Sequence, residues 1–263
     1  MPIKNNAFIK GISLRTGSYS QRIQFPPISP IITEKDVADM AEVFRLSSID
    51  RMNIIEEYNK SLTYYTGLLD RIQRDLNHAV EIHSPYFSLD SLRNDLDYYT
   101  RSARGVKCSI RYEQNLLDNM DNSMEGLQQT IREFALIRGY TRFYGGDGWI
   151  FGETCPIMIL QVPLGIYRVG IQASCSELNT SAISIQRIHK DGVRLYGYSE
   201  TMYIHPHISD HPCFGTFAPQ LNKMIQMHLF SNIFLLLIEY LATYGMDPYV
   251  GIQAFWRTPY VWS

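Results

Sequence analysis

The sequence predicts an α+β fold, because the hydrophobic period changes near Gly139. Before this glycine, apolar residues recur every three or four positions, as on the buried seam of a helix. After it come short apolar runs separated by turn residues, and then one long apolar helix over residues 224–244. These observations indicate a long helical hairpin, then an antiparallel β-meander, then a C-terminal packing helix.

The composition is that of a chain with a real hydrophobic core. Hydrophobic residues make up 45% and charged residues 19% of the 263 positions, which excludes a wholly disordered protein. The net charge of -2 gives no general attraction to nucleic acid or lipid, so neither is an expected partner. The N-terminus lacks a secretory signal, and the longest apolar stretch is too short and polar to span a membrane. We therefore expect a cytoplasmic protein.

Residues 1–33 form a candidate basic arm, residues 34–139 a helical region, and residues 140–263 an α+β domain. The arm has no acidic residue and four basic ones: Lys4, Lys10, Arg15 and Arg22. Three prolines then break any regular element: Pro26, Pro27 and Pro30. The arm is either a poorly ordered terminus or an extended segment that docks on a neighbouring subunit.

The helical region contains two heptad seams. Thr33 and Asp36 resemble an N-terminal cap, which opens a helix through Met40 and Phe44. The first seam steps by three and four in turn: Ile55, Tyr58, Leu62, Tyr65, Leu69, Ile72, Leu76 and Ala79. A shorter amphipathic piece ends near Gly105. The second seam follows, with Glu113 as its polar exception: Ile110, Leu117, Met120, Met124, Leu127, Ile131 and Phe134.

Seams of similar length are buried either by an antiparallel helical hairpin or by a coiled coil between chains. In the functional interpretation they form an oligomerisation or docking rod. In the alternative, the helices pack on the rest of their own chain. The periodicity predicts helices but leaves their partner open.

The α+β domain begins with a predicted hairpin turn at residues 144–149, YGGDGW. This cluster lacks the Lys and Ser/Thr of a phosphate-binding loop, and a helix precedes rather than follows it. Strands are predicted at residues 157–162, 167–173, 182–188 and 193–198.

A histidine-rich segment between the meander and the last helix holds the candidate site. One interpretation is a zinc site, because three imidazoles and a thiolate can complete a tetrahedral set: His205, His207, His211 and Cys213. The other is a cysteine nucleophile, because nearby imidazoles can activate the thiol of Cys213. The other three cysteines are better interpreted as small apolar residues: Cys108, Cys155 and Cys175. No cofactor other than this alternative zinc is expected.

The order of elements and motifs over residues 110–258 resembles the ubiquitin-conjugating enzyme fold. In that family a His-Pro-Asn motif precedes the catalytic cysteine, and helices follow. The similar residues here are His205-Pro206-His207, then Cys213-Phe214-Gly215, then the helix at 224–244 and Asp247-Pro248-Tyr249. The resemblance implies catalytic roles for Cys213, His207 and His205.

Three departures bear on that implied chemistry. The family's asparagine, which stabilises the oxyanion, is His207 here, and an imidazole can donate one hydrogen bond in its place. The spacing from His205 to Cys213 is shorter than in the family, and the intervening glycine is absent. Non-catalytic relatives of the same fold serve as binding scaffolds.

Two main functions are therefore expected from the sequence. The favoured one is a non-catalytic assembly protein that uses the module and the helical hairpin for protein contacts, as in a larger particle such as a viral or phage one. The alternative is a thiol enzyme that carries an acyl group on Cys213 as a thioester. The zinc-stabilised binding module is a third possibility.

Overall fold

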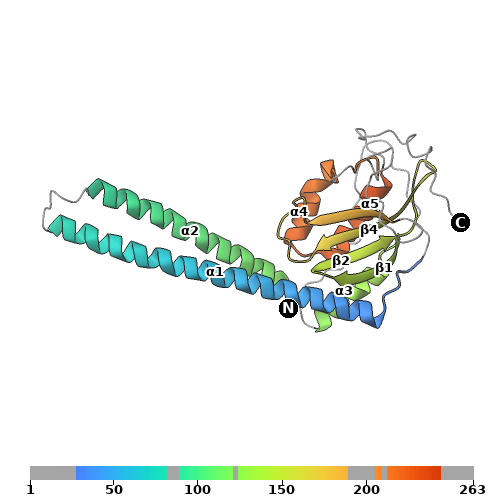
Figure 1. Cartoon of the computed structure of the whole chain (residues 1–263), viewed down its shortest axis with the longest axis horizontal. Helices are drawn as coiled ribbons and strands as arrows, with labels where there is room; N and C mark the ends of the chain where they lie inside the picture. Colours follow the sequence, from blue (N-terminus) through green and yellow to red (C-terminus); the bar gives the residue numbers. More distant parts are fainter. Residues whose placement is uncertain (1–27, 82–88, 121–123, 189–204, 209–211, 244–263) are drawn as a thin grey trace.

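The computed structural model describes residues 28–81, 89–120, 124–188, 205–208 and 212–243. The fold is α+β, as predicted: two long helices precede a five-stranded antiparallel sheet and C-terminal helices (Figure 1). Within these ranges, no helix combines the length and the apolar character needed to cross a membrane. The predicted strand at 193–198 and most of the basic arm lie outside the described residues.

Helix α1 (Glu34–Glu81) is a single helix of 48 residues, about 72 Å long. The predicted cap is confirmed. The Thr33 hydroxyl accepts a hydrogen bond from the Asp36 amide at 3.2 Å, and the Asp36 carboxylate accepts one from the Thr33 amide at 2.9 Å. This reciprocal pair satisfies two backbone donors at the start of the helix.

Helix α2 (Leu89–Asn119) runs back along α1, and the rings of Tyr65 and Tyr99 meet across the pair at 6.2 Å. The predicted end near Gly105 is wrong, because Ala103 and Val106 continue the heptad seam through this point. The predicted second seam is also wrong as one element: α2 ends at Asn119 and a separate helix, α3 (Met124–Leu136), follows.

Strands β1 (Tyr140–Gly146) and β2 (Trp149–Thr154) form the predicted hairpin. Its turn residues, Asp147 and Gly148, have φ values of 50° and 79°, the left-handed conformation that a tight hairpin turn requires.

The predicted strand at 157–162 turns back on itself instead. Strand β3 (Ile157–Ile159) ends at Leu160 and Gln161, which adopt φ values of 49° and 66°, and β4 (Val162–Gln172) returns antiparallel to it. Leu and Gln carry no turn signal, so the sequence pattern missed this hairpin. Strand β5 (Ile183–Ile188) then pairs with β4.

The predicted helix at 224–244 is divided in two. Helix α4 (Ala218–Gln226) ends before His228, whose φ of 50° redirects the chain, and α5 (Phe230–Ala242) begins two residues later. Helix α5 lies across one face of the sheet (Figure 1).

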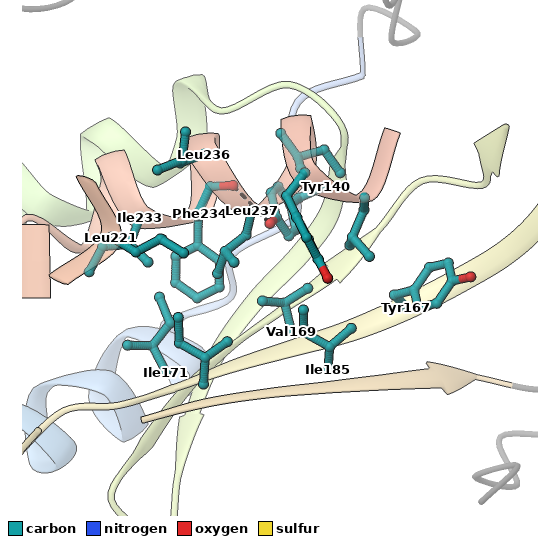
Figure 2. Close-up of a cluster of buried hydrophobic side chains, with 14 of the residues drawn as sticks. Tyr140, Tyr167, Val169, Ile171, Ile185, Leu221, Ile233, Phe234, Leu236 and Leu237 are labelled. Atoms are coloured by element: carbon teal, nitrogen blue, oxygen red, sulfur yellow. Dashed lines mark hydrogen bonds between the residues drawn. The ribbon is translucent and has the colours of Figure 1, made fainter. Parts of the chain in front are cut away.

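The hydrophobic core lies between α5 and the sheet. Figure 2 shows Ile233, Phe234 and Leu237 of α5 above residues of β4 and β5, and the Tyr140 hydroxyl donates a hydrogen bond to the Phe234 carbonyl at 2.9 Å. The same core includes Met40 of α1. The first turns of the long helix therefore belong to the body of the molecule, and the rest of it projects with α2 (Figure 1).

Candidate functional site

A tight turn forms the first part of the candidate site. The Ile208 amide donates a hydrogen bond to the His205 carbonyl at 3.0 Å, which closes the turn over Pro206 and His207. The turn packs on the C-terminal end of α5, where helical carbonyls lack partners within the helix.

His205 is fully buried, and both of its ring nitrogens have partners. Nδ1 accepts a hydrogen bond from the His207 amide at 3.2 Å, so Nε2 carries the proton and donates it to the Leu241 carbonyl at 2.8 Å. Burial lowers the pKa of His205 to about 3, which keeps the ring neutral. This geometry favours the interpretation in which His205 braces the loop, because no ring nitrogen is left for a metal or a substrate.

His207 and Cys213 are brought together through the backbone. The Cys213 amide donates a hydrogen bond to the His207 carbonyl at 3.1 Å, and the Tyr240 hydroxyl donates to the same oxygen at 3.0 Å. The Cys213 side chain is exposed, and the His207 ring is half-buried. Burial lowers the pKa of His207, so its ring is neutral at neutral pH and can donate one hydrogen bond or accept one.

Tyr240 of α5 is the residue that joins the two motifs, and the sequence pattern did not single it out. Its ring lies 5.9 Å from the His205 ring and 5.2 Å from the Phe214 ring, measured between centroids. The His-Pro-His turn and the Cys-Phe-Gly segment therefore share one aromatic support.

The predicted zinc set cannot be assembled from the described part of the chain. His211 lies outside the described residues, and within them no group of three or more His, Cys, Asp or Glu side chains is placed to hold a metal ion. With His205 committed to the backbone, the zinc-stabilised loop stays a prediction.

The other cysteines follow the prediction in part. Cys155 and Cys175 are buried, and burial raises the pKa of the Cys155 thiol. Cys108 differs from that prediction, because it is exposed, in the middle of α2.

A buried ion pair joins the two helices at the base of the helical hairpin, and its arginine also binds the body. Arg51 of α1, only 1% exposed, contacts Glu113 of α2 at 2.8 Å. The same guanidinium donates hydrogen bonds to the carbonyls of Ser174 at 2.9 Å and Cys175 at 3.2 Å, in the loop after β4. Arg51 and Glu113 both occupy seam positions, so this contact sets the register of α1 against α2 as well as their attachment to the sheet.

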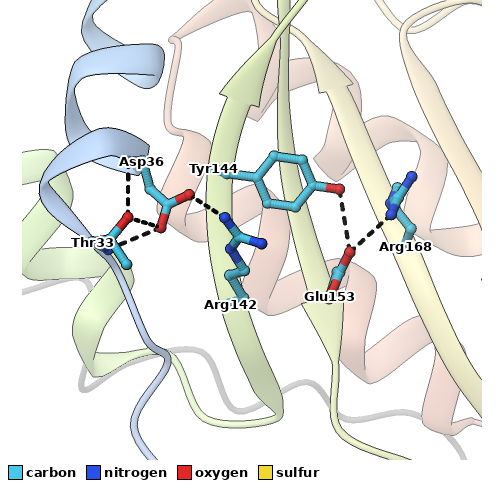
Figure 3. Close-up of polar contacts among 6 residues, drawn as sticks. All are labelled: Thr33, Asp36, Arg142, Tyr144, Glu153 and Arg168. Carbon is cyan, nitrogen blue, oxygen red and sulfur yellow. Dashed lines mark hydrogen bonds and ion pairs between the residues drawn. The ribbon is translucent and has the colours of Figure 1, made fainter. Parts of the chain in front are cut away.

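A second contact fixes the start of α1 to the sheet. Asp36 in the helix cap contacts Arg142 of β1 at 2.7 Å (Figure 3). Burial raises the pKa of Asp36, but the hydrogen bonds from Arg142 and Thr33 outweigh it and hold the pKa below its usual value.

Further polar contacts extend from Arg142 across the sheet. Figure 3 shows the Tyr144 ring lying between Arg142 and Arg168, whose guanidinium carbons are 4.9 and 5.8 Å from the ring centroid. Glu153 accepts hydrogen bonds from the Tyr144 hydroxyl at 3.3 Å and from Arg168 at 3.0 Å. Burial and the charge of Glu153 raise the pKa of Tyr144 to about 12. The network links α1 to β1, β2 and β4.

These anchors were beyond sequence reasoning, apart from one signal: Glu113 interrupts an otherwise apolar seam. A charged residue at such a position needs a buried partner, but Arg51 lies outside the predicted first seam.

No protein-family model, curated protein or solved structure matches this chain. The candidate site is therefore argued from its geometry alone.

Proposed function

We propose that this chain is a non-catalytic assembly protein, in which an α+β body presents a projecting helical hairpin to other proteins. The observation that carries the proposal is the placement of the hairpin. Two contacts hold the first part of α1 on the body: Asp36 to Arg142, and Arg51 to the carbonyls of Ser174 and Cys175. Beyond Arg51, residues 54–81 and 89–109 extend away from the body (Figure 1). We call this part the free hairpin.

The free hairpin contributes little to the body's own core. Its seam side chains from Ile55 to Leu76 are only half-buried, and α1 beyond Arg51 supplies no residue to the core around the sheet within the described residues. A long helical pair with a half-buried seam retains apolar surface for another helix or protein to cover.

The body supports the proposed likeness to the ubiquitin-conjugating fold through its order of elements. A helix, antiparallel strands, a His-Pro turn and two helices follow one another, as in non-catalytic scaffold relatives of that family. All four cysteines are free thiols, which supports a location in the reducing cytoplasm, including within a particle assembled there. Fold likeness alone does not assign function.

Site-specific photo-crosslinking in the native host tests the proposal. A photoreactive residue would replace Tyr98 on the free hairpin, and Met158, which is 54% exposed on β3, would be the matched body position. We expect crosslinked protein adducts from position 98 and few from position 158. Adducts from position 158 with none from position 98 would move the docking surface to the body and contradict the proposal.

One observation keeps a thiol enzyme as a second candidate: Cys213 is exposed and its amide lies against the His207 carbonyl. In this mechanism the Cys213 thiolate attacks an activated acyl group, expels its leaving group and forms a thioester, with His207 donating to the oxyanion. Incubation with activated ubiquitin-like protein should then give a thioester adduct that an added thiol cleaves and that Cys213→Ser abolishes. An adduct in neither protein would exclude this alternative.

A further inference from the structure

The two flanks of the free hairpin differ sharply in character. In the heptad frame set by the Tyr65–Tyr99 contact, Tyr64 and Tyr98 both lie beside the seam on the same flank. They are 63% and 60% exposed, and each ring packs on its seam neighbour, at 5.7 and 5.1 Å. We call this flank the tyrosine face.

The tyrosine face is poor in charge over its middle. Besides the two tyrosines its middle presents Ile54, Ser61, Leu68, Ser102, Gly105 and Ser109, and its charged residues are Glu57, Arg71, Asp75 and Asp95. A Cβ added at Gly105 would meet no atom within 4 Å, so the backbone of α2 is open to close approach there. The opposite flank is polar and charged: Glu56, Asn59, Thr63, Asp97, Arg104 and Lys107. Exposed tyrosine with little charge is the composition of an interface centre rather than of a solvated surface.

We propose that the tyrosine face binds the same face of a second copy of this chain and forms an antiparallel four-helix bundle. This inference rests on the proposed assembly function and names its partner. The face is about 40 Å long and about 20 Å wide, so pairing would bury about 800 Å² on each copy. That is the area that a stable dimer buries per partner.

The body determines the antiparallel orientation. Tyr112, at the base of this flank, donates a hydrogen bond to the Ser176 carbonyl at 2.8 Å, so the loop after β4 overhangs the base of the face. In a parallel pair both bodies would occupy the same end, whereas an antiparallel pair places the two bodies at opposite ends of the bundle.

The two-fold axis of such a pair crosses the middle of the face, close to Tyr64 and Tyr98. Residues near the axis meet their own counterparts, so uncharged side chains are required there. Away from the axis, the exposed Glu57 of one copy comes within about one helical turn of Arg71 of the other. The face is therefore compatible with itself in charge.

Light scattering of the full-length protein, over a range of concentrations, tests this inference. We expect twice the chain mass for the wild type and at least a tenfold weaker dimer for Tyr64→Glu/Tyr98→Glu. The matched control, Thr63→Glu/Asn94→Glu, adds the same charge to exposed positions away from the tyrosine face and should remain dimeric. If circular dichroism shows that the glutamate variant loses helix, Tyr64→Ser/Tyr98→Ser replaces it.

A monomeric wild type at high micromolar concentration would overturn the inference, and so would a dimer that the tyrosine variants leave intact. Either result is distinguishable from failure of the proposed function. Photo-crosslinks from position 98 to a different protein would keep the assembly function and reject only the second copy as its partner.

Discussion

Arg51 and Glu113 show how two charged residues can decide the architecture of a largely apolar seam. Each alone would be costly to bury. Together they lie at 2.8 Å, and the carbonyls of Ser174 and Cys175 accept hydrogen bonds from the same guanidinium. A buried ion pair adds little net stability compared with apolar residues, but it penalises every register that separates its partners. The pair therefore specifies how α2 lies on α1.

Removing one partner should be far more costly than removing both. Arg51→Ala should lower the free energy of unfolding by about 3 kcal/mol, because it leaves the Glu113 carboxylate buried without its partner. Arg45→Ala, which breaks the exposed pair with Glu42, should cost less than about 1 kcal/mol. Urea unfolding measures both. Recovery of the unfolding free energy in Arg51→Met/Glu113→Leu would support this interpretation of the ion pair. A loss of stability in Arg51→Ala no larger than that in Arg45→Ala would contradict it.

His205 should make the body sensitive to acid. In the unfolded chain its imidazole binds a proton below about pH 6.5, whereas in the fold its pKa is about 3. The stability that His205 contributes is therefore complete above pH 6.5 and declines as the pH falls toward 3.

Between pH 6.5 and pH 5 this decline amounts to about 2 kcal/mol, at about 1.4 kcal/mol for each pH unit. His205→Gln keeps a donor for the Leu241 carbonyl but does not titrate. Comparing urea midpoints of the two proteins at pH 7 and pH 5 isolates His205 from His228, which titrates in a similar window. Equal pH dependence in the two proteins would show that His205 is not buried as a neutral ring.

Among single residues, the sequence pattern predicted part of the candidate site. The cluster of histidines around Cys213 drew attention because such residues are rare, and the fold places His207 and Cys213 in backbone contact. The support from Tyr240 could not be predicted, since it depends on where α5 packs. The buried role of His205 likewise depends on a helix end that lies 36 residues away.

Helix α1 packs closely against strand β1 at a glycine. A Cβ on Gly145 would lie 2.6 Å from the Asp39 carbonyl oxygen and 2.7 Å from the Met40 Cα, both backbone atoms that cannot move aside singly. The next residue, Gly146, faces open space. The pair provides a matched test of whether α1 is docked on the sheet.

Gly145→Ala should destabilise the protein by about 1–3 kcal/mol, because the added methyl forces α1 away from β1. Gly146→Ala should change the stability by less than about 0.5 kcal/mol. Thermal unfolding followed by circular dichroism measures both. Similar melting temperatures for the two variants would mean that α1 does not pack on the sheet as described.

Element prediction succeeded where local chemistry and periodicity agree. The Thr33–Asp36 cap, the first seam and the Asp147-Gly148 turn are all encoded by neighbouring residues. It failed where the fold imposes a backbone conformation that the residue type does not favour. Leu160, Gln161 and His228 all adopt positive φ, and each ends an element that the apolar pattern would have continued.

At the scale of the whole molecule, the change of period near Gly139 is a change of secondary structure rather than a boundary between separate cores. Met40 of α1 and Phe134 of α3 pack in the same cluster as the sheet and α5. The free hairpin leaves the body instead beyond Arg51, and the proposed function follows this division: assembly for the free hairpin and structural support for the body.

In the proposed function the free hairpin, rather than Cys213, binds the other components of the assembly. A shortened protein that lacks residues 58–71 and 93–106 removes two heptads from each helix, and these ranges face each other, as Tyr65 and Tyr99 do. The body and its Arg51–Glu113 anchor remain.

The most direct measurement is the native size of the assembly in extracts of cells that express the wild type, the shortened protein or Cys213→Ser. We expect the wild type and Cys213→Ser to migrate together in a large species, and the shortened protein to migrate as a free, folded chain. A shortened protein that still enters the large species, or a Cys213→Ser protein that leaves it, would contradict the account.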